Sequence, residues 1–313
     1  MSTQAGAPAS EHPVTLVTGT SSGIGLHAAV ELARRGHTVV ATMRDTTRSG
    51  ALEEAARAAG VTLDVRALDV VDHEAARACV EAVVADHGRL DVLLNNAGRG
   101  AVATAEQLTV EQVRDQLELN YVAPVHLTQV ALPHLRARGG GRVLTVTSVG
   151  GVVGQPFADA YCGAKFAVEG FMQSLAPVAQ ALRVWVSVVE PAAVASDFVG
   201  NVDRPAAGSA DGGTDGTNGT DGTDGTDGTD RGGAAEMGDP YAGLLRAYLE
   251  RTAGAFDSAQ SAQDAGVAVA DACTATAYRF RWQTSEAAER FVGLSLGDLD
   301  GERVLGATRT WLG

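Results

Sequence analysis

The stretch Thr18-Gly19-Thr20-Ser21-Ser22-Gly23-Ile24-Gly25 stands between a short apolar run, Val14–Thr18, and an amphipathic stretch, Leu26–Arg35. The apolar run is typical of a buried parallel strand, and the amphipathic stretch predicts a helix. A strand, a glycine-rich turn and a helix in this order are the context that a dinucleotide-binding turn requires. We therefore predict that these residues form the first strand–turn–helix unit of an α/β fold.

Each glycine of this turn has a predicted task. Gly19 permits the tight turn, Gly23 lets the backbone approach a pyrophosphate, and Gly25 lets the helix pack on the strand. The helix N-terminus offers free N–H groups to phosphates. The spacing is Gly-x-x-x-Gly-x-Gly, so a glycine-rich turn without a ligand stays open as an alternative. The candidate cofactor-binding residues here are Gly19, Ser21, Ser22, Gly23, Ile24 and Gly25.

Strands and helices are predicted to alternate along the residues that follow. The predicted strands are His37–Thr42, Val61–Leu68, Asp91–Leu94, Arg142–Thr147, Arg183–Glu190 and Tyr278–Trp282. The predicted helices are Ser49–Ala59, Asp72–His87, Thr109–Arg138 with breaks at Pro124 and Pro133, a helix that continues to about Leu182, Tyr241–Phe256, Asp264–Thr276 and Ser285–Phe291. This alternation predicts a single-domain α/β fold with a Rossmann-like, doubly wound parallel sheet of about seven strands and helices on both faces.

The tip of the second predicted strand bears on the choice of cofactor. An acidic side chain there would accept a hydrogen bond from the ribose 2′-OH of NAD, but Met43 takes this place and Arg44 follows. Arg44 with Ser21 could hold a 2′-phosphate through charge-assisted hydrogen bonds, which favours NADP(H) and leaves NAD(H) possible. The alternatives are a solvated arginine, or an arginine that pairs with Asp45.

A second cluster of polar residues lies between Ser148 and Lys165. Tyr161 and Lys165 are four residues apart, so on a helix both side chains share one face. An ammonium beside a phenol favours the phenolate and would lower the pKa of Tyr161. Ser148 follows the strand Arg142–Thr147 and can serve as a neutral donor. These parts suit proton transfer to a carbonyl oxygen, although Tyr-x-x-x-Lys also arises by chance on helix surfaces.

Four predicted strands end in residues of this kind. Gly19, Asn95, Ser148 and Pro191 each follow a strand, and ligands of parallel sheets bind beyond the carboxyl ends of the strands. Asn95-Asn96-Ala97-Gly98 suits the close approach of a cofactor ribose, or a plain turn. Asn120 lies inside a helical pattern, where it marks a kink, a bound water or only a solvated side chain.

Two segments are predicted to lie outside the folded core. Residues 1–12 read as a disordered tail, and residues 13–313 as the single domain. Residues 208–233 are dominated by Thr-Asp-Gly repeats, which cannot bury enough apolar surface to become ordered. This insert falls within residues 192–260, where we expect a lid over the substrate.

Composition excludes several classes of partner. The formal net charge of −14 argues against nucleic acids and anionic membrane surfaces. No apolar run approaches the ~18 residues that span a bilayer, so we expect no integral membrane segment. Three widely spaced cysteines favour a reduced, cytoplasmic protein, and the seven histidines show no metal-ligand spacing. Hydrophobic residues are 45% of the chain but aromatic ones only 5%, so Ala, Val and Leu must fill the core.

Taken together, these motifs resemble the classical short-chain dehydrogenase/reductase family. Thr18–Gly25 matches its Thr-Gly-x-x-x-Gly-x-Gly, and Asn95–Gly98 its Asn-Asn-Ala-Gly. Pro191 to Ser196 is similar to its Pro-Gly-x-x-x-Thr, with Ala192 and Ser196 as departures. The residues that match its catalytic tetrad are Asn120, Ser148, Tyr161 and Lys165. The resemblance covers about residues 13–198. Within the family, the chain most resembles the branch of estradiol 17β-dehydrogenase type 1 and the photoreceptor retinol dehydrogenases.

The resemblance implies a role for each residue. Tyr161 would be the acid in reduction and the base in oxidation, Lys165 would lower its pKa and bind the nicotinamide ribose, and Asn120 would hold a water. Asp69 and Val70 would meet the adenine. The other cofactor contacts implied are Asn96, Ala97, Gly98, Pro191, Val194 and Ser196. The resemblance also implies a homodimer or homotetramer. The histidine that the estradiol enzyme uses on its steroid falls near Gly243 here, which argues against an estrogen substrate.

The sequence therefore predicts an NADP(H)-dependent oxidoreductase. It would interconvert a ketone or aldehyde and an alcohol on a hydrophobic small molecule of steroid, retinoid or polyketide type. Two alternatives stay open: an NAD-linked secondary-alcohol dehydrogenase, and a catalytically idle regulator of the same fold that senses the cofactor.

Overall fold

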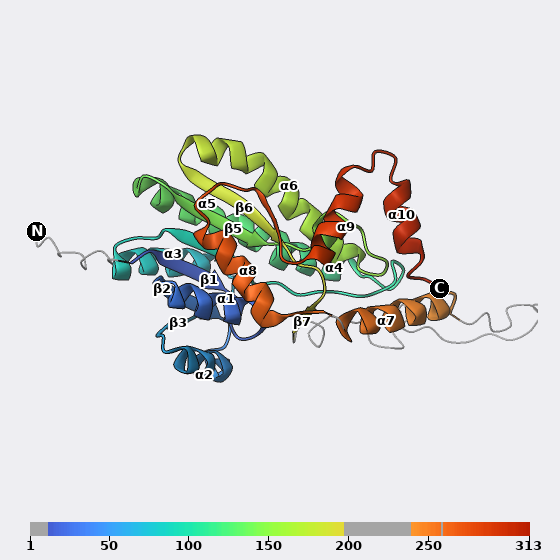
Figure 1. The fold of residues 1–313 in the computed structure, drawn as a ribbon, viewed down its shortest axis with the longest axis horizontal. Coiled ribbons are helices and arrows are strands. Elements are labelled where there is room, and N and C mark those ends of the chain that lie inside the picture. Colours follow the sequence, from blue (N-terminus) through green and yellow to red (C-terminus); the bar gives the residue numbers. More distant parts are fainter. Residues whose placement is uncertain (1–11, 197–238, 258) are drawn as a thin grey trace, which may run out of the picture.

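The structure, a computed structural model, describes residues 12–196, 239–257 and 259–313, without the side chains of residues 255–257 (Figure 1). The predicted tail, apart from His12, and the predicted insert 208–233 lie outside the described residues. The same holds for residues 197–238 of the predicted substrate lid.

Seven parallel strands form one sheet in the order β3-β2-β1-β4-β5-β6-β9. The strands are β1 Val14–Thr18, β2 Thr38–Met43, β3 Asp64–Ala67, β4 Val92–Asn95, β5 Gly141–Val146, β6 Val184–Glu190 and β9 Arg281–Gln283. Leu16 of β1 pairs with both Val40 of β2 and Leu93 of β4, so the chain runs outward from β1 in both directions. This reversal between β1 and β4 is the point where sheets of this kind bind ligands. The predicted doubly wound parallel sheet is confirmed.

Helices cover both faces of the sheet, as predicted. One buried cluster joins the strands to α1 Gly23–Arg34, α2 Gly50–Ala59 and α8 Ala262–Thr274. The other joins them to α3 His73–His87, α5 Ala123–Ala137 and α6 Asp159–Ala181. The side chains of successive strand residues point in turn to one cluster and to the other. The strands β1 and β4 are therefore apolar on both sides.

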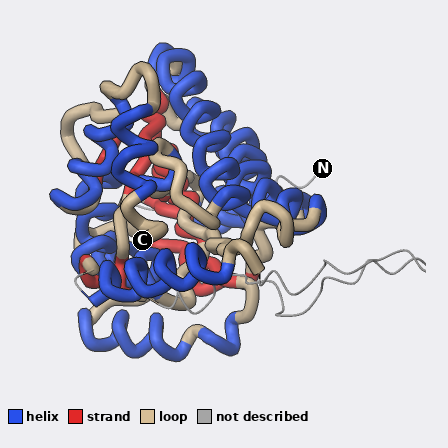
Figure 2. Tube along the Cα trace, turned by 90° about the vertical axis from the view of Figure 1, so that its right-hand side faces the viewer, coloured by secondary structure: helices blue, strands red, loops and turns tan. Residues whose placement is uncertain are grey.

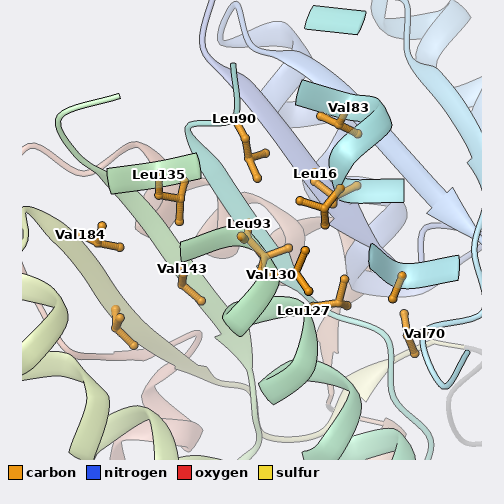
Figure 3. Close-up of a cluster of buried hydrophobic side chains, with 14 of the residues drawn as sticks. Leu16, Val70, Val83, Leu90, Leu93, Leu127, Val130, Leu135, Val143 and Val184 are labelled. Carbon is orange, nitrogen blue, oxygen red and sulfur yellow. The ribbon is translucent and has the colours of Figure 1, made fainter. Parts of the chain in front are cut away.

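Small aliphatic side chains fill the core. In Figure 3, Leu16, Leu93 and Val143 from adjacent strands gather beside Leu127 and Val130 of α5. All five are nearly or fully buried, and Leu, Val and Ala dominate both clusters. The prediction that a chain poor in aromatic residues would be filled by Ala, Val and Leu is confirmed.

The two edge strands are shorter than the sequence predicts. Gly60, with a φ of +69°, ends α2 in a left-handed turn, and the chain joins the sheet only at Asp64. The predicted strand Val61–Leu68 therefore shortens to β3. At the other edge, the predicted strand Tyr278–Trp282 shifts to β9, which pairs with the last three residues of β6. Tyr278 instead donates its hydroxyl to the carbonyl of Val186, at 3.1 Å.

The predicted helix Thr109–Arg138 is three segments. The α4 helix, Val110–Leu117, passes through a π-helical turn, η2 Glu118–Val122, into α5. Pro124 directly follows the π-helical turn, so the break predicted there is a change of helix type, and Pro133 lies inside the continuous helix. The break predicted at Pro133 is therefore wrong. Of the alternatives for Asn120, the π-helical turn agrees with a kink, and the burial of the side chain excludes a solvated one.

The remaining elements lie beyond the carboxyl ends of the strands (Figures 1 and 2). They are α7 Ala242–Asp257, α9 Glu286–Leu296, α10 Glu302–Arg309 and a small parallel pair, β7 Val194–Ala195 and β8 Gln260–Ser261. The helices α1, α7, α8 and α9 differ from their predicted bounds by one to five residues at an end. Ser285 caps α9 as predicted, with its hydroxyl accepting from Ala288 N at 3.3 Å.

Candidate active site

A cavity of about 1160 Å³ lies at the carboxyl ends of the strands. All of the cofactor-binding residues predicted from the sequence line it, and so does Ser148. Asn120 is buried just behind its wall. The structure thus brings together residues from the ends of β1, β4, β5 and β6, the four strand ends that the sequence predicts to converge, and adds residues from the end of β2.

The loops after β1 and β4 are joined by one asparagine. The side-chain amide of Asn96 donates to the carbonyls of Thr18 and Gly19, each at 2.9 Å. The hydroxyl of Thr18 accepts from the backbone N–H groups of Asn96 and Ala97, each at 3.0 Å. These contacts explain why amide side chains suit the end of β4. They join the loop after β1 to the loop after β4, which no strand pairing connects.

Two glycines of the first turn are required by close approach. Gly19 has a φ of +71°, and a Cβ there would lie 2.8 Å from Ala97 Cα. A Cβ on Gly25 would lie 2.3 Å from both Asn96 Nδ2 and the Gly19 carbonyl oxygen. The tight turn predicted for Gly19 is confirmed, whereas Gly25 lets α1 approach the Asn96 side chain and not the strand. This cradle, followed by the N-terminus of α1, fits the diphosphate of a dinucleotide.

Cationic side chains stand at the far end of this cradle. Arg44 is exposed at the end of β2 and lines the cavity with Ser21. Asp45 caps the next turn, with its carboxylate accepting from Thr47 N at 2.9 Å. Arg48, which the sequence does not single out, also lines the cavity. It is the last residue of the short turn η1 Thr46–Arg48, four residues after Arg44, and this four-residue spacing is the signal that the sequence offers.

The catalytic candidates meet at the inner end of the cavity. Tyr161 and Lys165 lie on α6, and the Lys165 ammonium is 5.8 Å from the centre of the Tyr161 ring. Ser148 precedes the short turn η3 Val149–Gly151, and its hydroxyl oxygen accepts from Gly150 N at 2.9 Å. Ser148 also shares a hydrogen bond with the Tyr161 hydroxyl. The phenol, the ammonium and the hydroxyl donor therefore form one group.

Burial controls the protonation of this group. It raises the pKa of the Tyr161 phenol above its usual range, and the hydrogen bond with Ser148 opposes that change. It also lowers the pKa of Lys165 to about 8. The predicted lowering of the tyrosine pKa is therefore wrong for this structure: the pKa is raised, and burial is the largest cause. The phenol is neutral near pH 7 and carries a proton that it can donate.

Asn120 presents an unpaired acceptor beside Lys165. Its amide nitrogen donates to the Arg99 carbonyl and to Gln116 Oε1, each at 3.0 Å. Its Oδ1 atom is buried and has no hydrogen-bond partner among the described residues. A Cβ on Gly98 would lie 2.8 Å from this oxygen and 3.4 Å from Lys165 Nζ. Asn120 Oδ1 and the Lys165 ammonium therefore flank one small glycine, where a water has two polar partners.

Aromatic side chains form one wall of the cavity. Tyr248 of α7 lies 5.5 Å from the ring of Phe157 and 6.4 Å from that of Trp311. Phe291 of α9 meets Trp311 edge-on at 5.8 Å. Tyr248, Phe291 and Trp311 line the cavity. The sequence does not predict this wall, because single aromatic residues spaced over more than sixty positions leave no pattern.

Phe157 holds an unfavourable backbone conformation at the base of this wall. Its φ is +61°, which a bulky side chain rarely adopts and which costs about 1–3 kcal/mol. The Phe157 carbonyl accepts from Ala103 N at 2.9 Å, and the ring packs on Tyr248. Strain of this kind is common where a loop must place a side chain in a binding site.

Among the described residues, no group of His, Cys, Asp and Glu gathers as metal ligands would. No described helix is both long enough and apolar enough to cross a bilayer. Cys162, next to Tyr161, is buried, and burial raises the pKa of its thiol to about 11. It packs as a small apolar side chain, as predicted.

Comparison with known proteins agrees with the site. The family model described as short chain dehydrogenase matches residues 13–206. Estradiol 17-beta-dehydrogenase 1 of Rattus norvegicus is 44% identical over 194 residues, which are 59% of this chain and 55% of the rat enzyme. Retinol dehydrogenase 8 of Bos taurus is 39% identical over 204 residues, which are 64% of this chain and 65% of the bovine enzyme. The chain thus matches between about half and two thirds of the length of these relatives.

Solved structures extend the likeness beyond the matched sequence. A short-chain dehydrogenase from Streptomyces avermitilis has a TM-score of 0.71 at 27% identity, over 96% of each chain. A variant of the actinorhodin polyketide ketoreductase, solved with NADPH, has a TM-score of 0.58 at 33% identity, over 60% of this chain and 74% of the ketoreductase.

Proposed function

The chain belongs to the short-chain dehydrogenase family, and from this membership and its site we propose that it is an NADP(H)-dependent oxidoreductase. It would interconvert a ketone or aldehyde and the corresponding alcohol on an apolar small molecule. The observation that carries the proposal is the meeting of Ser148, Tyr161 and Lys165 at the inner end of a cavity that begins at a dinucleotide cradle.

The chain's own residues supply the proton and the positioning. A bound nicotinamide supplies or takes up the hydride. In reduction, the neutral Tyr161 hydroxyl donates its proton to the substrate oxygen, which Ser148 holds by a hydrogen bond. In oxidation the same phenol oxygen takes the proton back. The Lys165 ammonium favours the phenolate that forms, and Asn120 Oδ1 beside it can hold a water that returns the proton.

Arg44 and Arg48 support the preference for NADP(H). Both guanidinium groups line the cavity at the end of β2, beside Ser21. A 2′-phosphate can accept charge-assisted hydrogen bonds from either arginine, whereas the ribose 2′-OH of NAD gains little from a cation. No acidic side chain takes the tip of β2, since Met43 ends the strand.

The aromatic wall supports an apolar substrate. Tyr248, Phe291 and Trp311 offer flat apolar faces to the cavity, and Leu249 of α7 adds to them. Such a surface suits a fused-ring or polyene ketone, in which dispersion and apolar burial supply the affinity. The relatives described above are named for estradiol, a fused-ring alcohol, and for retinol, a polyene alcohol.

Turnover by Tyr161→Phe tests the proposal. A panel of steroid, retinoid and polyketide-like ketones is offered with NADPH and with NADH, and NADPH affinity is measured by fluorescence. The variant should lose about 10²–10⁴-fold in kcat, because it lacks the proton donor, and should keep NADPH affinity within a few-fold. A parent that binds NADPH but turns over no carbonyl would favour a cofactor-sensing regulator. A variant that retains more than about a tenth of kcat would remove Tyr161 from the mechanism.

A further inference from the structure

A buried ionic cluster lies one helical turn behind the catalytic lysine. Glu169 follows Lys165 by four residues on α6 and is only 3% exposed. Its carboxylate accepts from the Thr147 hydroxyl at 2.6 Å and from Arg281 Nη1 at 2.7 Å. The same guanidinium donates to Glu190 of β6, which is fully buried. The cluster therefore joins α6, the end of β5, β6 and β9.

This cluster holds two carboxyl groups against one guanidinium. Burial and the charge of Glu190 raise the pKa of Glu169 to about 7, while Thr147 and Arg281 act in the opposite direction. Arg281 is therefore one of the two partners, with Thr147, that favour the ionised form of Glu169. Removing one partner of a buried pair leaves an uncompensated charge, which is costly in free energy.

Lys165 lies one helical turn before this carboxylate on α6. Its side chain is 4% exposed, and Nζ donates to the Val146 carbonyl at 3.1 Å. Burial lowers the pKa of Lys165, and the charge of Glu169 opposes that change. The charged or titratable groups around the two residues are Tyr161 on α6, Glu190 on β6 and Arg281 on β9. The α4–η2 turn, which packs on α6, adds the buried amides of Gln116 and Asn120.

The loop that carries Ser148 is also built around Glu169. A Cβ on Gly151 would lie 2.8 Å from Glu169 Cγ and 3.2 Å from the Lys165 carbonyl oxygen. The loop can pass this close to α6 only because residue 151 has no side chain. Glu169 thus contacts the element that positions Ser148 and follows Lys165 on the same helix.

We propose that Glu169 is a positioning residue that keeps Lys165 in the ammonium form, and that Arg281 of β9 keeps Glu169 ionised for this task. The inference rests on the proposed function only for its effect on turnover. The effect on Lys165 itself follows from the geometry of α6, β6 and β9.

Lysine NMR provides a direct test, because Lys165 is the only lysine of the chain. Protein grown with [ε-¹³C]lysine should give one ε-carbon resonance, whose shift with pH reports the protonation of Lys165. In the parent the midpoint should lie near pH 8. In Glu169→Gln it should move to lower pH, so that the lysine is mostly neutral where the parent is half protonated.

Glu169→Gln is a conservative change. The glutamine amide can keep bonds to Thr147 and Arg281, since its oxygen can face the guanidinium and its NH₂ group the hydroxyl. Glu54→Gln removes the same charge from an exposed position of α2 and serves as the control, which should leave the midpoint unchanged. Arg281→Gln, if it folds, should move the midpoint in the same direction as Glu169→Gln.

Turnover is measured alongside. The alkaline limb of kcat against pH should move to lower pH in Glu169→Gln, whereas a merely structural loss would scale kcat equally at all pH values. An unchanged lysine midpoint in a folded Glu169→Gln variant would overturn the inference. A moved midpoint in a protein without turnover would uphold it and count against the proposed oxidoreductase alone.

Discussion

The two walls of the cavity are built from different materials. The nucleotide wall, made of the loops after β1, β2 and β4 with the start of α1, consists mainly of backbone, glycines and short polar side chains. The substrate wall, made of Tyr248, Leu249, Phe291 and Trp311, consists of large side chains from α7, α9 and the C-terminal residues. A wall made of backbone fits one ligand shape, because single substitutions cannot reshape it. A wall made of large side chains can be reshaped by one substitution at a time. The difference teaches that the proposed cofactor site depends on the spacing of small residues, and the proposed substrate site on the volume of large side chains.

Gly25→Ala should disrupt the nucleotide wall and leave the substrate wall intact. Among the substitutions that test the two walls, it should have the largest effect. The new Cβ would have to displace the Asn96 side chain, which holds the carbonyls of Thr18 and Gly19. NADPH binding should weaken by about 3 kcal/mol or more, roughly a hundredfold in Kd. Gly163→Ala is the control, since its Cβ meets nothing within 4 Å and an alanine should stabilise α6 slightly. Isothermal titration with NADPH decides, and an unchanged Kd in Gly25→Ala would contradict the close approach.

Arg44→Ala tests the same wall, because it should change the affinity for NADPH and not that for NADH. Loss of a charge-assisted hydrogen bond should weaken NADPH by about 1.5–3 kcal/mol and leave NADH nearly unchanged. Arg48→Ala should show whether the second guanidinium shares the phosphate. Equal losses for NADPH and NADH in Arg44→Ala would mean that the residue does not read the 2′-phosphate.

Trp311→Leu should affect only the substrate wall, with the smallest effect. The ring is 9% exposed and packs against Tyr248 and Phe291. Removing these ring contacts should raise KM for an apolar ketone by roughly 3–30-fold, on the scale of about 0.5–1.5 kcal/mol for an aromatic pair plus lost apolar area. NADPH affinity should stay unchanged, and a parallel loss of NADPH affinity would show that the walls are not separate.

The sequence predicts the nucleotide wall well for a physical reason. A turn that needs φ > 0 at Gly19, or no side chain at Gly25, accepts few other residues at these positions. The spacing of its glycines can therefore be recognised in the sequence. The meeting of Ser148, Tyr161 and Lys165 is predicted because helical spacing and parallel strand ends fix it. Both predictions rest on local rules, and the structure places these residues as those rules require.

What the sequence did not predict depends on contacts between distant residues. The ends of β3 and β9 are set by how far β2 and β6 can pair with them, which no local pattern records. Pro133 continues a helix because packing on the sheet outweighs its local cost. The higher pKa of Tyr161 follows from burial, whereas spacing shows only that a lysine is near. Trp311 gave no signal, since its partners lie on α7 and α9.

The pairing of α8 with α1 has a consequence for the newly made chain. A Cβ on Gly266 of α8 would lie 2.5 Å from His27 Cβ, so the two helices cross almost backbone to backbone. Arg35, just after α1, donates to the Thr274 hydroxyl at 2.9 Å across 239 residues of sequence. At synthesis rates of about 5–20 residues per second, this distance takes roughly 12–48 s to produce. Until then the side of α1 that α8 covers lacks this helix, and we expect that side to stay exposed on the growing chain.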